Sequence, residues 1–125
     1  PGGDSSLVLF DRNEFRRAAR TASIFARDGS GIVRIQMEPG NGTDGKISVL
    51  ARADEIGEQQ GELDANVEGE ESKIAFNGRY LADALNAIDP GQVAIETTGP
   101  ASPGVFRPTA NDNYVHVVMP MFVQW

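Results

Sequence analysis

One pattern of apolar and capping residues occurs twice along the chain, and this repeat limits the folds that are available to it. A short apolar run ending at Phe10 is followed by Asp11 and a helical spacing of apolar residues, and the same order returns at Phe76 and Asn77, 66 residues later. Asp and Asn are good N-cap residues because their side chains accept hydrogen bonds from free amides of the first helical turn. The repeat therefore predicts two similar units, each opening with a strand and a capped helix.

Each predicted helix is followed by three stretches with strand character. The helical spacing runs from Phe15 to Ala26 and again from Tyr80 to Ile88. The strands that follow are predicted at 32–37, 46–53 and 58–67, and then at 92–97, 104–107 and 114–121. The carboxylate-rich stretch 58–67 is predicted to be an edge strand. The fold class is therefore α+β, a duplicated β-α-β-β-β unit with two amphipathic helices side by side on antiparallel sheets.

Length and composition exclude several classes of protein. The 125 residues, 13.4 kDa in mass, suit a single domain. The absence of cysteine excludes disulfides, thiol catalysis and thiolate metal sites, and a single histidine excludes a poly-histidine metal centre. No apolar run is long enough for a membrane span, and residues 1–6 lack the features of a signal peptide. We therefore expect a soluble, cytoplasmic domain without a membrane role.

Positive charge is concentrated around the first predicted helix. The chain carries 11 Lys and Arg against 18 Asp and Glu, which gives a net charge of −7. Residues 11–27 nevertheless hold five arginines against two acidic residues, a local balance of +3, while the rest of the chain balances at −10. The composition leaves two interpretations open: a solvated helix face that is rich in arginine, or a basic surface for nucleic acid.

The candidate catalytic groups do not form a recognisable site. His116 lies in an apolar strand, and no serine or carboxylate has the spacing of a catalytic partner, so a structural or surface role is favoured. The pairs Asp54-Glu55 and Glu70-Glu71 cannot converge on one point, because adjacent strand residues point to opposite faces. The glycine-rich stretches match neither a phosphate loop nor a dinucleotide fingerprint. We expect no enzyme, no metal and no cofactor.

The end of the sequence is unusually apolar. Pro120 is expected to stop strand pairing, and Met121–Trp125 are expected to lie against the surface. Met and aromatic side chains there are compatible with two interpretations, an adaptable binding surface or the completion of the core.

The stretch Lys73–Leu85, with the letters KIAFNGRYLADAL, closely resembles part of the bacterial DNA polymerase III beta subunit, the sliding clamp. Three other segments agree with that family in order and spacing: 15–34, 98–103 and 114–121, the last ending in Val-Val-Met-Pro-Met. Together they cover nearly the whole chain and match the third, C-terminal domain. The resemblance implies that residues 1–125 form a single clamp domain, and the first two domains of the family have no counterpart in the sequence.

The resemblance implies a non-catalytic processivity factor of DNA replication. In this family six such domains, three from each subunit, close a head-to-tail ring around duplex DNA with the helices lining the hole. A sliding ring contacts phosphates without reading bases. For this chain the implied DNA-facing residues are Arg16, Arg17, Arg20 and Arg79.

The resemblance also implies a site for short peptides of replicative and repair polymerases and of the clamp loader. Met and Val would line an apolar slot, with Asn77 and Tyr80 as polar groups at its rim. The matching positions are Ser30, Asn77, Tyr80, Ala101, Pro103, Val117, Val118, Met119, Pro120 and Met121. Many relatives carry Arg-Leu where Phe122-Val123 follow here, so the peptide preference is expected to differ.

A third implied surface is the subunit interface. Ile24 and Phe25, together with Glu55 and Glu58, would pack against the first domain of the other subunit. The full-length parent is expected to be a head-to-tail homodimer, and the isolated domain a monomer. The alternative is a stand-alone protein-interaction module that has the clamp fold and no role on DNA.

Overall fold

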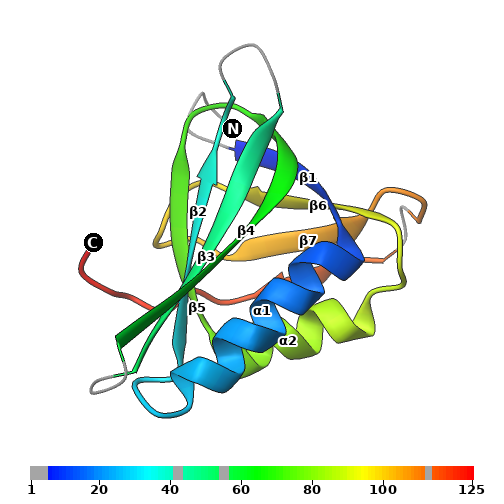
Figure 1. The fold of residues 1–125 in the computed structure, drawn as a ribbon. Helices are drawn as coiled ribbons and strands as arrows, with labels where there is room; N and C mark the ends of the chain where they lie inside the picture. The colour runs from blue at the N-terminus through cyan, green and yellow to red at the C-terminus, as the bar shows by residue number, and fades with distance from the viewer. Residues whose placement is uncertain (1–5, 41–43, 54–56, 112–113) are drawn as a thin grey trace.

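The computed structural model describes residues 6–40, 44–53, 57–111 and 114–125, and its elements follow the predicted order (Figure 1). The helices are α1 (Arg12–Ala26) and α2 (Gly78–Ala87). The strands are β1 (Ser6–Asp11), β2 (Ile32–Glu38), β3 (Gly45–Ala53), β4 (Gly57–Glu68), β5 (Ser72–Asn77), β6 (Gln92–Thr97), β7 (Gly104–Pro108) and β8 (His116–Val118). The order β-α-β-β-β therefore occurs twice, as the sequence predicts.

The strands form one antiparallel sheet in the order β5-β2-β3-β4-β1-β6-β7-β8. Each repeat places its first strand in the part of the sheet that the other repeat builds. β5, the first strand of the second repeat, pairs with β2, and β1, the first strand of the first repeat, pairs with β6. The two repeats are therefore interleaved by strand exchange.

The prediction that 58–67 is an edge strand holds for part of β4. β4 is not at an end of the sheet order, but residues 57–65 pair with β3, and the pairing with β1 involves residues 66–68. Its alternating carboxylates also mark the solvent face of a strand whose other face is covered. Leu63 and Ala65 are buried, and the intervening Asp64 is exposed. In the described sheet the strands at the two ends of the order are β5 and β8.

The last strand is shorter than the predicted 114–121. Only His116–Val118 pair with β7, through the register Gly104↔Val118 to Phe106↔His116. Pro120 has no amide hydrogen to donate, so the pairing cannot continue through it.

Both helices begin at their predicted N-caps. The carboxylate of Asp11 accepts a hydrogen bond from the amide of Glu14 at 3.1 Å. The Asn77 side chain accepts from the amides of Arg79 and Tyr80 at 2.9 and 3.2 Å. The two helices pack side by side on the same face of the sheet (Figure 1).

A row of buried aromatic rings joins the two repeats. The Phe10 ring lies 4.9 Å from Phe15 and 6.5 Å from Phe106, measured between centroids and in edge-to-face orientation. Phe76 lies 6.1 Å from the same Phe106 ring. Phe10 and Phe76 hold equivalent places in the two repeats, so Phe106 links them across the core.

Candidate nucleic-acid and peptide interfaces

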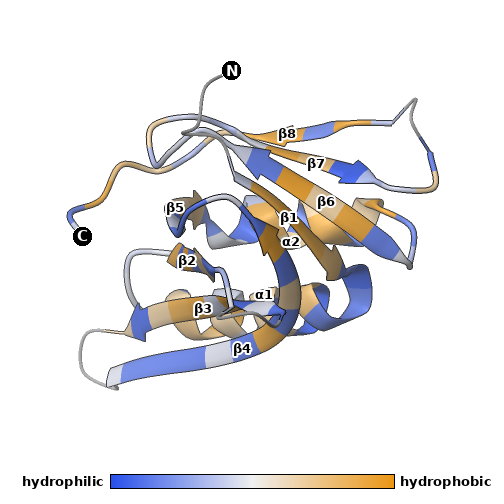
Figure 2. Cartoon of the chain, turned by 90° about the horizontal axis from the view of Figure 1, so that it is seen from above, coloured by the Kyte–Doolittle hydropathy of each residue, from blue (hydrophilic) through white to orange (hydrophobic). Residues whose placement is uncertain are grey.

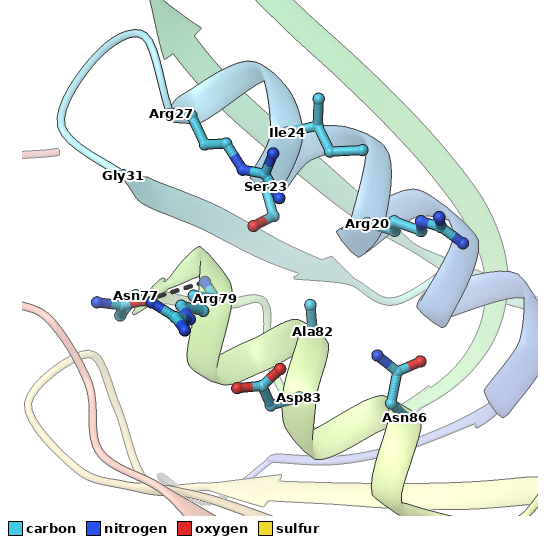
Figure 3. Close-up of a pocket in the computed structure, with 10 residues that line it drawn as sticks. All are labelled: Arg20, Ser23, Ile24, Arg27, Gly31, Asn77, Arg79, Ala82, Asp83 and Asn86. Carbon is cyan, nitrogen blue, oxygen red and sulfur yellow. Dashed lines mark hydrogen bonds between the residues drawn. The ribbon is translucent and has the colours of Figure 1, made fainter.

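A cavity of about 980 Å³ lies between α1 and α2 (Figure 3). Arg20 and Arg27 contribute from α1 and its C-cap, Arg79 contributes from α2, and Asp83 is the acidic side chain of the lining. We call this cavity between α1 and α2 the helix gap. Its three arginines against one aspartate give it a positive charge. Its open, polar lining suits a charged binding partner rather than an apolar ligand.

Two further arginines were predicted for this surface, and the structure separates them. Arg16 lies toward α2, where its Nε donates a hydrogen bond to Oδ1 of Asn86. Arg17 lies on another side of α1 and lines a cavity with Gln59 and Glu62 of β4. Of the predicted arginines, Arg20 and Arg79 therefore line the helix gap. Arg16 borders it through its bond to Asn86, and Arg17 does not line it.

Arg27 is a residue of the helix gap that the predicted set omitted. It lies seven positions after Arg20, and residues seven apart fall on the same face of an α-helix. The signal was therefore present in the basic segment 11–27. Reading the spacing of the arginines, rather than their number, would have selected Arg27 over Arg17.

A second candidate site is an exposed apolar surface on β8 and the residues that follow it. The exposed fractions are 54% for Val117, 66% for Met119, 38% for Met121 and 62% for Tyr80 on α2. Figure 2 shows the apolar colour continuing beyond β8 toward the end of the chain. α2 contacts β8, so Tyr80 comes from an element that borders this surface. We call Tyr80, Val117, Met119 and Met121 the apolar surface.

The other predicted peptide-site residues surround the apolar surface or lie beneath it. Val118 and Pro120 are buried, so they support the surface instead of forming it. Pro103 is half-buried and lines a cavity of about 320 Å³ with Val105, whose strand partner is Val117.

Three predicted positions lie in or next to turns. Ala101 is exposed in the turn between β6 and β7. Ser30 is exposed after α1, and its hydroxyl accepts from the Ile32 amide at 3.2 Å. The loop that holds Ser30 is joined to α2 by a bond of 2.9 Å from the Gly78 amide to the Gly31 carbonyl, directly after Asn77.

The apolar chain end does not complete the core. Phe122 is 79% exposed and Trp125 is 46% exposed. The Trp125 ring instead packs against two cations, with Cζ of Arg34 at 5.2 Å and Nζ of Lys73 at 5.7 Å from its centroid. These contacts agree with the expectation that Met121–Trp125 lie against the surface, and a binding role for the segment stays a prediction. Phe122, which the predicted set omitted, extends the exposed apolar side chains of this region.

The predicted interface residues have different surroundings. Ile24 is 50% exposed and lines the helix gap. Phe25 is partly buried and packs against the core cluster. Glu58 forms an ion pair with Arg52, with Oε2 at 3.1 Å from Nε, and Glu55 lies outside the described residues.

The remaining polar candidates form no common metal-binding group within the described part of the chain. Nδ1 of His116 lies 3.2 Å from the Tyr114 hydroxyl, and Glu70 and Glu71 are exposed. Asp54 lies outside the described residues, as Glu55 does. Among the residues that the structure describes, no group of His, Cys, Asp or Glu could hold a metal ion, and no helix is long and apolar enough to cross a membrane.

The fold is that of bacterial sliding clamps. The chain superimposes on the DNA polymerase III beta subunit of Pseudomonas aeruginosa with a TM-score of 0.85 and 29% identity, over 98% of this chain and 32% of that chain. For the DNA polymerase sliding clamp of Bacillus subtilis the TM-score is 0.86 at 25% identity, over 99% of this chain and 32% of that one.

Within this class the chain belongs to the family of the DNA polymerase III beta subunit, C-terminal domain, whose model matches residues 1–122. The Beta sliding clamp of Staphylococcus aureus is 37% identical over 115 residues, and that of Staphylococcus epidermidis is 34% identical over 112. These matches cover 91% and 89% of this chain but 29% of each relative. The predicted resemblance is therefore confirmed, for a chain that spans less than a third of the relatives it matches.

Proposed function

We propose that this chain is one non-catalytic domain of a replication processivity clamp, which encircles duplex DNA in the bacterial cytoplasm. The observation that carries the proposal is the basic helix gap in an otherwise acidic chain. Arginines on paired helices attract phosphates, and the acidic remainder discourages DNA from binding elsewhere. Phosphates repeat along a duplex whatever its sequence, so contacts of this kind hold DNA without fixing its position.

The test is fluorescence anisotropy of a labelled duplex at several salt concentrations. We expect weak binding that is independent of sequence and declines with salt. Replacing Arg20 and Arg79 by Gln should flatten the dependence of log K on log salt by about 0.9 for each phosphate that is no longer neutralised. The matched control is Arg107→Gln on β7, because Arg107 pairs with Glu96 away from the helices.

Tight, sequence-specific binding at physiological salt would contradict a sliding mode of binding. An equal loss of binding in the Arg107 variant would contradict the assignment to the helix gap. Complete absence of DNA binding at low salt would favour a protein-interaction module without a DNA role, an alternative that the family match does not favour.

The apolar surface is the docking site for partner peptides in this proposal. Its exposed Met and Val side chains suit the apolar anchors of a short peptide, and Met adapts to anchors of different shape. Replicative and repair polymerases and a clamp loader are the partners that a clamp must tether. Ser30, Asn77, Ala101 and Pro103 would border the bound peptide, and Val118 and Pro120 would support it from below.

Peptide docking is tested by NMR titration with a short peptide that carries a Gln and apolar anchors. Shifts should concentrate at Val118, Met119 and Met121. Val117→Asp should abolish them, whereas Ile24→Asp, which changes an equally exposed apolar residue on α1, should not. Saturating peptide that leaves those residues unmoved in the folded domain would remove this part of the proposal.

The subunit interface is the third part of the proposal. Ile24, Phe25, Glu55 and Glu58 would meet another domain of the ring, and the full-length parent would be a head-to-tail dimer. Sedimentation should show a monomer for the chain described here and a dimer for a longer polypeptide that includes the preceding domains. Ile24→Asp should weaken that dimer. Ile24 tests the interface better than Phe25, because Phe25 also packs on the core.

A further inference from the structure

The segment that follows β8 is fixed to the opposite edge of the sheet. The Met121 amide donates a hydrogen bond of 2.7 Å to the carbonyl of Ala75 on β5. Nη1 of Arg34 on β2 donates a second bond of 2.8 Å to the carbonyl of Gln124. Because β5 is an edge strand, its outward carbonyls are available for such a bond. Residues 121–124 are thus held at both ends.

Trp125 adds a further contact between this segment and the sheet. Its ring lies beside the guanidinium of Arg34 and the ammonium of Lys73, and both cations are attracted by the negative face of an indole. Arg34 acts twice, since the same side chain binds the Gln124 carbonyl and contacts the ring. Its planar guanidinium can donate and stack at once, which an ammonium cannot do.

The burial of Ala75 fits a segment that covers the outer face of β5. Ile74 and Phe76 belong to the core cluster, so Ala75 between them points to the other side of the sheet. It is nevertheless fully buried. Its register partner on β2 is Arg34, the residue that holds the segment.

We propose that Trp125 is a positioning residue, a latch that holds residues 119–124 on β5 and β2 and so presents Met119, Met121 and Phe122 to a partner peptide. The inference rests on the proposed peptide-binding function. Binding to a surface that is already ordered loses less conformational entropy than binding to a free chain end. The latch therefore contributes to peptide affinity although Trp125 need not contact the peptide.

The experiment compares the unmodified chain with Trp125→Ala, Trp125→Phe and Arg34→Lys. Hydrogen exchange of the Met121 amide reports the latch, and anisotropy of a fluorescein-labelled peptide with a Gln and apolar anchors reports affinity. Trp125→Ala should speed Met121 exchange and weaken the peptide by about threefold to tenfold, in the range set by one or two exposed cation–π interactions. Trp125→Phe should restore most of both, because it keeps an aromatic face, and Arg34→Lys should resemble Trp125→Ala. The unfolding midpoint should fall only slightly in the three variants, because they loosen a surface segment and leave the core contacts in place.

Each result decides between the latch and its alternatives. Unchanged Met121 exchange in Trp125→Ala overturns the latch, whether or not the peptide binds. Faster exchange with unchanged affinity overturns its role in presentation, and tighter binding shows that the segment obstructs partners. If the unmodified chain fails to bind any peptide, the proposed docking function fails, and exchange at Met121 still shows whether the segment is latched.

Discussion

Asn77 has a structural role in the helix and also a place in a candidate binding site. Its side chain caps α2 by accepting from the Arg79 and Tyr80 amides, and it lines the helix gap beside the predicted peptide site. A substitution there can therefore change folding and binding together. Separating the two effects requires a variant that keeps the cap.

Asn77→Ala should lower the free energy of unfolding by about 1 kcal/mol, the usual cost of removing an N-cap. Asn77→Asp should keep it, because a carboxylate accepts the same bonds and favours the positive end of the helix. Urea denaturation measures both. Equal stability of the two variants would show that the cap bonds contribute nothing measurable. If Asn77→Ala is less stable, as expected, only the Asp variant should be used to examine peptide binding.

Phe106→Ala should destabilise the domain by about 3–5 kcal/mol, as expected for a buried aromatic ring. The destabilisation follows from removing the ring that joins Phe10 and Phe76. Val105→Ala is the neighbouring control, since its half-buried side chain lies on the opposite face of β7. Denaturant unfolding followed by circular dichroism should separate the two variants clearly. Similar destabilisation in both would contradict the central place of Phe106.

Single residues were predictable from sequence where their partners are local. The caps at Asp11 and Asn77 bind amides two or three positions away, so cap chemistry alone identified them. The surroundings of Trp125 could not be predicted in this way. Arg34 lies more than ninety positions earlier in the chain, and only the folded sheet brings the two together.

At the scale of elements, alternation predicted that strands exist but not where they pair. The alternating pattern around Leu63 correctly predicted a strand. Its place beside both β3 and β1 depends on segments far away in sequence, which alternation does not encode. On α1 the limit was different, because the spacing of the arginines did encode their division between two sides of the helix, and the prediction used only their number.

Lys46 on β3 joins the two neighbouring strands through charge. Its Nζ lies 3.3 Å from Glu62 of β4 and 3.6 Å from Glu38 of β2. The hydrogen bond and charge of Glu62, followed by the charge of Glu38, raise the pKa of Lys46 above its ordinary value of 10.5. A raised pKa in the folded state means that the stabilisation is complete below pH 10.5 and is lost as pH rises through the folded pKa.

NMR titration of the Lys46 side chain should give a midpoint above 10.5 in the unmodified chain. Glu62→Gln should lower that midpoint toward the ordinary value, because it removes the larger of the two charge effects. Glu58→Gln is the control, since Glu58 pairs with Arg52 instead. A midpoint that Glu62→Gln leaves unchanged would contradict the assigned cause.

At the scale of the whole molecule, the repeat predicted the element order and the paired helices, and the family resemblance predicted the clamp fold. Neither the repeat nor the resemblance predicted that β1 and β5 change places between the repeats. Two similar units could equally have formed two separate sheets. The exchange was decided by long-range pairing, in which β1 joins β6 and β5 joins β2.

A cut between Glu70 and Glu71, in the exposed connection from β4 to β5, tests the exchange. Fragments 1–70 and 71–125 should each stay unfolded, because each lacks a strand that its part of the sheet requires. Mixing them should restore native circular dichroism and NMR spectra. The uncut chain refolded in the same buffer is the control. A fragment that melts cooperatively by itself would show that the repeats are separable.

The strand exchange also determines how the two proposed binding surfaces, the helix gap and the apolar surface, are lost when the domain unfolds. The helix gap and β8 depend on strands that belong to both repeats, so we expect them to unfold together in the unmodified chain. Heating should abolish attraction for a polyanion and capture of a peptide at the same temperature, in a single transition. If the proposed clamp function holds, unfolding should therefore remove DNA binding and peptide binding together, without a state that keeps only one of them.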